Sequence, residues 1–197
     1  MDTYPVHLSV VQPSRFTRLQ LALRMVAFLV LGLLGIGFGL VFVVAYVALP
    51  AFACLRLSSH HDRYFDEDAP KVLRLLRWLA AVSGWAGLIA EHLPTGAPDE
   101  SIRIAVAGRP HATASLALLR LLTGIPSALV LGLLCVLGGF VWVWAAFSIL
   151  FFERVGPHAF RYLVGLQRWS VRLLAYQASL VDPYPPFSFA EDSRVGA

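Results

Sequence analysis

Two long stretches of this chain consist almost entirely of apolar residues. Residues Met25 to Leu55 and Leu121 to Phe152 contain no Asp, Glu, Lys or Arg. About 20 apolar residues in a helix cross the hydrocarbon core of a bilayer, so each stretch is long enough for one crossing. The first stretch starts too late and is too long to be the core of a cleaved signal peptide. The pattern therefore predicts two membrane helices.

A second pattern, in which apolar and polar residues alternate, precedes each long stretch. It occupies PVHLSVVQP (5–13) and IRIAVAGRP (102–110), and both segments end at a proline. Alternation with β-branched residues, closed by proline, is typical of a short strand. After each long stretch comes a loop and then an apolar helix with an Arg-Trp pair, at Arg77-Trp78 and again at Arg168-Trp169.

These features recur in the same order in both halves of the chain. VLGLL occurs at 30–34 and again at 130–134, and Pro94 and Pro185 follow the two Arg-Trp pairs at equal spacing. Recurrence at a fixed period indicates a repeated unit. The sequence therefore predicts a tandem repeat, with one unit at 4–96, a second at 101–189 and a polar tail at 190–197. Each unit has a strand, a long helix, a loop and a second helix.

The second helix of the second unit carries three arginines, Arg161, Arg168 and Arg172. Their spacing places them within about 40° of each other on one helical face. Such a helix either lies among the lipid headgroups, with its arginines toward water, or crosses the membrane with its arginines against protein. An arginine at the bilayer centre costs about 2.5–3.5 kcal/mol, which favours the first interpretation. Similar units need similar surroundings, and hence an even number of crossings each, which favours the second.

The predicted fold is accordingly an all-α integral membrane protein of two tandem repeats, each a short strand plus two membrane helices. Four membrane helices and short interfacial segments are expected, and the two uncharged stretches are the firmest part of this prediction. Composition agrees, because 58% of the 197 residues are hydrophobic and only 14% are charged. A chain of this size cannot bury so much apolar surface in water.

Charge indicates lipid rather than nucleic acid as the partner of the basic residues. The net charge is +4, and every basic residue except Lys71 is an arginine. Arginines that flank apolar stretches are typical of contact with anionic headgroups. Four crossings would divide the basic residues evenly between the two sides, so the positive-inside rule gives no orientation. We expect a multi-pass protein of the bacterial plasma membrane with cytoplasmic termini.

Candidate contact residues fall into two sets. Basic and aromatic residues on the second helices are candidates for contact with lipid or a partner: Arg74, Arg77, Trp78, Arg161, Arg168, Trp169 and Arg172. Glycines of the long stretches are candidates for close helix packing, since small residues let membrane helices approach: Gly32, Gly35, Gly39, Gly132, Gly138 and Gly139.

Catalytic chemistry has little support. The loop HHDRYFDED (60–68) offers His60, His61 and Asp62, but adjacent histidines point in different directions and lack the spacing of metal ligands. Cys54 and Cys135 form no metal or disulfide pattern. No metal site, cofactor or catalytic residue is predicted, and the absence of intramembrane carboxylates argues against an ion-coupled transporter or a membrane enzyme.

The second unit resembles a bacterial integral membrane family, common in actinobacteria and known only as a domain of unknown function. The resemblance rests on IPSALVLG, WAAFSILF, FRYLVGLQRWSVRLLAY and DPYPPFSF. It implies a membrane protein of one or two repeated units and implies no reaction, cofactor or catalytic residue. The first unit matches loosely, because EHLP stands where DPYPPF would.

The function predicted from these features is a small accessory or scaffold subunit. It would pack against other integral membrane proteins and contact anionic lipids through its arginine-rich helix faces. One alternative is a lipid-binding or transport unit with an arginine-lined cleft. A second alternative is a membrane enzyme that uses the His60-His61-Asp62 loop.

Overall fold

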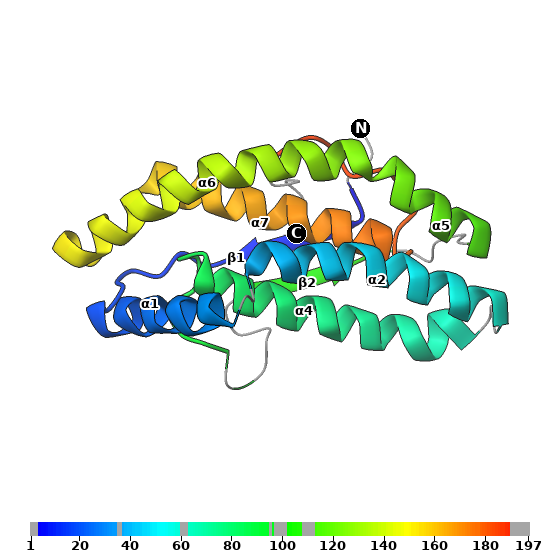
Figure 1. Cartoon of the computed structure of the whole chain (residues 1–197), viewed down its shortest axis with the longest axis horizontal. Coiled ribbons are helices and arrows are strands. Elements are labelled where there is room, and N and C mark those ends of the chain that lie inside the picture. Colours follow the sequence, from blue (N-terminus) through cyan, green and yellow to red (C-terminus); the bar gives the residue numbers. More distant parts are fainter. Residues whose placement is uncertain are drawn as a thin grey trace, which may run out of the picture.

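The computed structural model describes residues 4–34, 37–59, 63–94, 96, 102–107 and 113–189. Within them the chain is mostly helical, with one sheet of two short strands (Figure 1). The elements, in chain order, are β1 (Val6–Val10), α1 (Arg18–Leu33), α2 (Phe38–Ser59), the π-helical turn η1 (Tyr64–Asp68), α4 (Ala69–Ala86), β2 (Ile102–Val106), α5 (Ala114–Thr123), α6 (Ile125–Phe152) and α7 (Pro157–Gln177).

Local sequence explains where the helices begin. The Thr17 hydroxyl accepts a hydrogen bond from the Gln20 N–H at the start of α1, and Thr113 caps α5 in the same way. Prolines lie in the first turns of α4, α6 and α7, where no hydrogen bond of the helix is lost. Proline fits the first turn of a helix, so Pro126 in the segment TGIPS predicts a helix start at this point of the sequence, and α6 begins there.

The helices α4 and α7 end with the same backbone arrangement. Leu88 and Ser179 have φ of 60° and 55°, in the left-handed region. The Ile89 N–H donates to the Gly84 carbonyl at 2.8 Å, and the Leu180 N–H donates to the Ala175 carbonyl at 3.0 Å. A left-handed residue with this long backward hydrogen bond is the Schellman ending of a helix.

The first uncharged stretch is divided between two helices, since α1 ends at Leu33 and α2 begins at Phe38, and this corrects the expectation of one long helix there. In the second half the single helix α6 covers nearly all of the uncharged stretch, as expected. The stretches were identified by their lack of charge, and a lack of charge does not indicate where one helix ends and the next begins.

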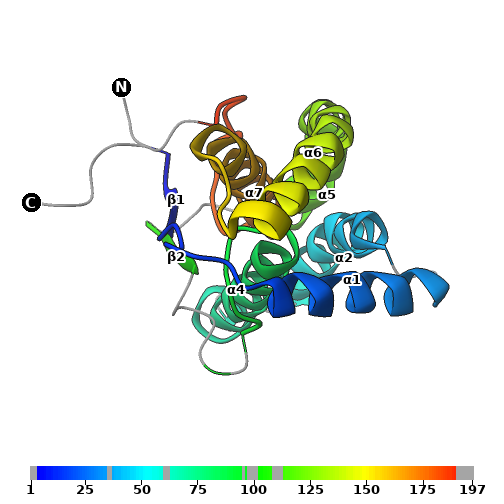
Figure 2. The ribbon, with the colours of Figure 1, turned by 90° about the vertical axis from the view of Figure 1, so that its left-hand side faces the viewer.

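The elements form three layers, which are clearest in Figure 2. The helices α4 and α7 occupy the middle, with the sheet on one side and α2, α5 and α6 on the other. In Figure 1, α2, α4, α6 and α7 all run along the long axis of the molecule. Figure 2 shows that α1 runs across the layers instead. From Leu163 to Val181 every residue except Ser170 is buried. The helix α7 is therefore the centre of the core.

Both strands expected from the sequence are present, and they pair with each other. The pairing is antiparallel, with Leu8 opposite Ile104 at its middle. Val6, Leu8, Ile102 and Ile104 point inward, each with no more than 3% of its surface exposed. The sheet thus covers α4 and α7 with its apolar face.

Nearly all the large apolar side chains that the structure leaves exposed lie on α1, α2, α5 and α6. Two helical segments, Gly39–Ser59 and Ile125–Phe152, are long and apolar enough to cross a membrane. Less than a quarter of each is buried inside the protein. A core helix of a soluble protein would be covered by protein, so these exposed apolar segments support a membrane location.

Candidate functional site

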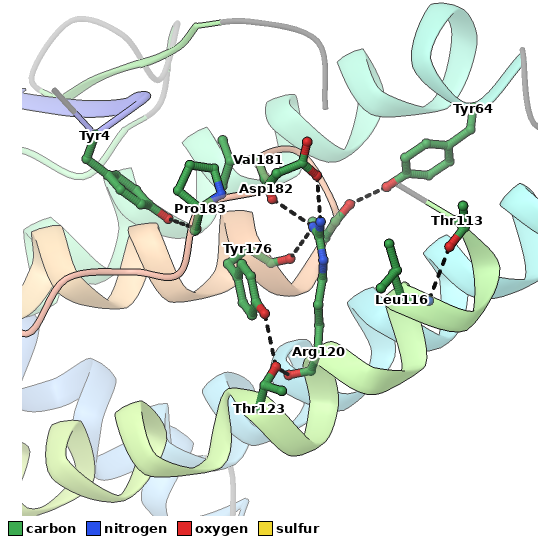
Figure 3. Close-up of polar contacts among 11 residues, drawn as sticks. Tyr4, Tyr64, Thr113, Leu116, Arg120, Thr123, Tyr176, Val181, Asp182 and Pro183 are labelled. Atoms are coloured by element: carbon green, nitrogen blue, oxygen red, sulfur yellow. Dashed lines mark hydrogen bonds and ion pairs between the residues drawn. The ribbon is translucent and has the colours of Figure 1, made fainter. Parts of the chain in front are cut away.

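The most elaborate polar cluster surrounds Arg120 of α5 (Figure 3). The guanidinium donates from Nη1 to the carbonyls of Val181 at 2.7 Å and Tyr176 at 3.1 Å. Its Nη2 donates to the Asp182 carboxylate at 2.8 Å. Its carbon lies 4.9 Å from the centre of the Tyr176 ring, within cation–π range. Arg120 therefore fastens α5 to the end of α7, where carbonyls have no partner inside the helix.

Other side chains reach the same end of α7. The Tyr64 hydroxyl donates to the Ala178 carbonyl, and the Tyr4 hydroxyl donates to the Pro183 carbonyl at 3.2 Å. The Gln177 amide nitrogen donates back to the Arg120 carbonyl at 3.0 Å. Gly124 leaves room for this last contact, because a Cβ there would strike the Gln177 amide. The end of α7 and the residues after it are thus held by η1, by α5 and by Tyr4.

Arg24 of α1 makes a matching set of contacts at the end of α4. Its Nη2 donates to the carbonyls of Ala90 at 2.6 Å and Glu91 at 2.8 Å, and its guanidinium lies 5.3 Å from the Trp85 ring. Arg24 is fully buried, and this burial lowers its pKa to about 10, so it remains charged at neutral pH. Arg24 and Arg120 are equally spaced from the capping threonine before them, Thr17 or Thr113.

Sequence analysis missed this pair of arginines. Both lie beside the uncharged stretches and were counted only as flanking charges. The signal that could have identified them is the equal spacing of strand, threonine and arginine in both halves. In the structure each of these arginines binds backbone carbonyls at the end of the last helix of its own half.

Of the three arginines predicted to share one face of α7, two are buried inside the protein and one is exposed. Arg168 donates to the Phe189 carbonyl at 2.7 Å, and Arg172 donates to the Ser188 carbonyl at 3.3 Å. Arg172 also lies 5.5 Å from the ring of Tyr4. Both are buried, whereas Arg161 is exposed at the start of the helix and contacts His158. The structure brings Arg168 and Arg172 together under residues 182–189 and leaves Arg161 apart.

The matching residues of α4 and α7 lie in different surroundings. Arg74 and Trp78 are exposed on α4, together with Lys71, and Arg77 donates to the Ile104 carbonyl of β2 at 3.2 Å. Trp169 of α7 is buried and makes edge contacts with Phe187 and Phe189. The exposed residues remain candidates for lipid contact, whereas Arg77 and Trp169 contact the chain itself.

One of the predicted packing glycines lies at a close helix contact within the chain. A Cβ on Gly138 would be 2.6 Å from a methyl carbon of Leu166 in α7. Around Gly32, Gly39, Gly132 and Gly139 nothing among the described residues comes within 4 Å of that position, and Gly35 lies outside the described residues. Sequence analysis missed Gly165, where Phe189 occupies the place of a Cβ.

Ionic contacts lie at the two ends of the helices. The acidic run before Ala69-Pro70 predicts Asp68 as the cap of a helix. Asp68 is at the N-cap position of α4, but its carboxylate binds Arg56 at 2.5 Å and Lys71 at 3.4 Å instead of the helix N–H groups. The hydrogen bond from Arg56 lowers the pKa of Asp68 below its usual value. At the other end Glu153, which follows α6, pairs with Arg15 and Arg18.

A shallow, open pocket of about 220 Å³ lies beside Arg120 and is lined by Leu116, Leu119, Thr123, Tyr176 and Asp182. Small-molecule sites usually have volumes of about 300–1,000 Å³. The described residues include no group of three potential metal ligands. The loop His60, His61 and Asp62 lies outside the described residues, as does the tail 190–197. The contacts of Arg120 and Arg24 hold helices of the chain to one another.

Residues 115–188 match a domain of unknown function, DUF4389. The DUF4389 match covers α5, α6 and α7 and most of the segment that follows, so it includes Arg168 and also includes Arg120 and Arg172 with the carbonyls they bind. It confirms, for this part of the chain, the resemblance to a domain of unknown function. No curated protein and no solved structure matches the chain.

Proposed function

We propose that this protein is a membrane-embedded accessory subunit, which holds other membrane proteins through its apolar helices and contacts anionic lipid through its exposed arginines. The observation that carries the proposal is the exposed apolar surface of α1, α2, α5 and α6, which exceeds what a soluble chain leaves uncovered. In the described part of the chain the polar clusters hold helices together and the pocket beside Arg120 is small and open. No three potential metal ligands lie together among these residues.

The proposal includes two copies of one strand–helix–helix unit, at 4–96 and 101–189. Several matched features support it. Arg24 and Arg120 bind corresponding carbonyls, Trp85 and Tyr176 lie beneath them, and the same left-handed helix ending follows in both halves. Unrelated segments would have no reason to share these contacts in the same order.

The open glycines and the exposed cations are the proposed contact points. Gly132 and Gly139 lie on the exposed part of α6, where a partner helix could approach closely. Arg74 and Arg161 have exposed side chains that can reach lipid phosphates, whereas Arg168 is occupied by its own chain. We therefore propose that α4 and the start of α7 contact lipid, because the arginines there are exposed.

The bacterial plasma membrane is the proposed location, and cytoplasmic termini stay a prediction. The four-helix crossing also stays a prediction. It is constrained by packing, because α4 and α7 run alongside α2 and α6 (Figure 1). The four helices therefore cross the membrane together or not at all.

Photocrosslinking in living cells tests the accessory role. A benzophenone amino acid is placed at Phe140 or Trp144, each 73% exposed on α6, and the adduct is sized after irradiation. A discrete protein adduct in constant ratio to the chain supports a subunit role. Gly139→Trp, which fills the open space on α6, should abolish that adduct, and Gly156→Trp, at an open glycine outside the helices, should preserve it. Adducts with lipid alone at both positions would overturn the accessory role.

The arginine-lined cleft of the lipid-binding alternative gains no such support. Arg168 and Arg172 are covered by the Ser188 and Phe189 segment, and the pocket described above opens at Arg120. Native mass spectrometry of the double variant Arg168→Ala and Arg172→Ala would revive this alternative if a lipid retained by the wild type were lost.

A further inference from the structure

The sheet lies beside the middle of the long helices rather than at their ends. In Figure 1 the two strands fall halfway along the molecule, and in Figure 2 they cover the side of α4 and α7 that faces away from α2 and α6. Individual contacts agree: β2 receives a hydrogen bond from Arg77, in the middle of α4, and Tyr4, just before β1, lies over Arg172 of α7. If the helices crossed a bilayer, the sheet would be at its centre.

A sheet of this kind does not suit the bilayer centre. Within the described residues β1 and β2 pair only with each other, so each has an outer edge of backbone N–H and C=O groups. Open edges and irregular segments that face lipid do not occur in the hydrocarbon region, because no water is present to bind them. The outward face of the sheet also exposes Ser9 and Arg103, and a charged side chain is costly at that depth.

The opposite side of the molecule has the composition that lipid requires. It is formed by α1, α2, α5 and α6, which carry nearly all the exposed large apolar side chains. Between that side and the sheet lies α4, whose exposed stripe of Lys71, Arg74 and Trp78 is of the kind found among headgroups. Polarity therefore changes from layer to layer across the short dimension of the molecule, not along its helices.

The dimensions of the layers fit half of a bilayer. A helix with its side chains is about 10 Å thick, and half of the hydrocarbon core is about 15 Å thick. One layer of helices therefore fits inside a single leaflet. The next layer, α4 and α7, then lies at the depth of the headgroups, where arginine and tryptophan are favoured.

We propose that the protein is embedded in one leaflet, with α2, α5 and α6 parallel to the membrane plane among the acyl chains and the sheet in water. The proposal rests on the membrane location in the proposed function, and it fixes which surface meets lipid. Both ends of every long helix then lie on the same side of the membrane. In this arrangement α2 and α6 are in-plane helices despite their length.

Cysteine labelling of the full chain tests this arrangement. With Cys54→Ala and Cys135→Ala as background, single cysteines replace Ser58 at the end of α2, His158 at the start of α7 and Ser9 on the sheet, all of which are exposed. The first two positions lie at opposite ends of the long axis, because α2 ends at one end and α7 begins at the other (Figure 1). A membrane-impermeant maleimide is added to spheroplasts and to inverted vesicles.

One-leaflet embedding requires that the cysteines at Ser58, His158 and Ser9 are labelled from one side and unlabelled from the other. Labelling of Ser58→Cys and His158→Cys from opposite sides would show that the helices cross, and would overturn the proposal. Protection of Ser9→Cys from both sides would also overturn it, because the sheet would then not be in water. Ala105→Cys, exposed on β2, repeats the sheet measurement should Ser9→Cys fail to accumulate.

The native Cys135 separates this proposal from the one on which it rests. Cys135 is exposed on α6 and is retained in a Cys54→Ala variant. It should react only after detergent is added, whether the helices cross or lie in the plane. Labelling of Cys135 in intact membranes would contradict the membrane location itself, whereas the three engineered positions decide only how the protein is embedded.

Discussion

Replacing Arg120 by Met should destabilise the protein strongly, because the methionine side chain fills similar space but donates no hydrogen bond. Arg120 has 6% of its side chain exposed and donates to the Val181 and Tyr176 carbonyls and to Asp182. Leaving a buried carbonyl unsatisfied costs about 1–3 kcal/mol. Asp182 is 41% exposed and can be solvated by water, and the Tyr176 carbonyl keeps its hydrogen bond from the Ser179 N–H, so the Val181 carbonyl is the buried group that loses its partner. We expect a loss of about 3 kcal/mol in the free energy of unfolding.

Thermal unfolding in mild detergent, followed by tryptophan fluorescence, measures this loss. For a chain of this size about 1 kcal/mol shifts Tm by about 2–4 °C, so Arg120→Met should lower Tm by about 6–12 °C. Arg120→Lys keeps the charge but loses the planar fork, and it should recover only part of the difference. Arg154→Met, at an exposed position, is the matched control and should change the free energy of unfolding by under about 0.5 kcal/mol. A Tm for Arg120→Met within about 2 °C of the wild type would contradict the conclusion that Arg120 holds α5 to the end of α7.

Three further outcomes follow from the packing and charge of the described residues. Gly138→Val should lose about 1–3 kcal/mol by overpacking against α7, whereas the neighbouring Gly139→Val, which meets open space, should lose almost nothing in the same assay. Asp68 has its pKa lowered by Arg56, so its contribution to stability is full above its unfolded pKa and is lost as pH falls through the folded value. A Tm profile across the acid range should therefore be flatter for Asp68→Asn, and an unchanged profile would contradict this role. Tyr64→Phe should lose about 1 kcal/mol with its hydrogen bond to the end of α7, and an unaltered Tm would rule that bond out.

Much of the local structure could be predicted because it depends on nearby residues. The strands at 5–13 and 102–110 were predicted from alternation and proline, and both are present as β1 and β2. Pro126 marked the start of α6 for the same kind of local reason. What could not be predicted is that the strands pair with each other, because pairing depends on how the two halves meet and leaves no pattern within either strand.

The candidate site shows the same division between local and long-range information. Helical spacing placed Arg161, Arg168 and Arg172 on one face, but the partners of Arg168 and Arg172 lie outside that helix, in residues 188–189 and at Tyr4. The glycines of the long stretches were selected by composition, yet of those that the structure describes only Gly138 meets a neighbouring helix of the chain at close range, and the equally close contact at Gly165 was not predicted. The sequence shows where the glycines are, but it does not show which of them lies opposite a large side chain such as Leu166 or Phe189.

The register of the sheet has one more implication. Leu8 faces Ile104 at the midpoint, and the pairs on either side are arranged evenly about it, so exchanging the two strands leaves the pattern unchanged. This is the isologous geometry in which separate subunits meet about a dyad. The two strands could therefore pair equally well between separate polypeptides, so two halves of this chain produced apart should reassemble without the linker that now joins them.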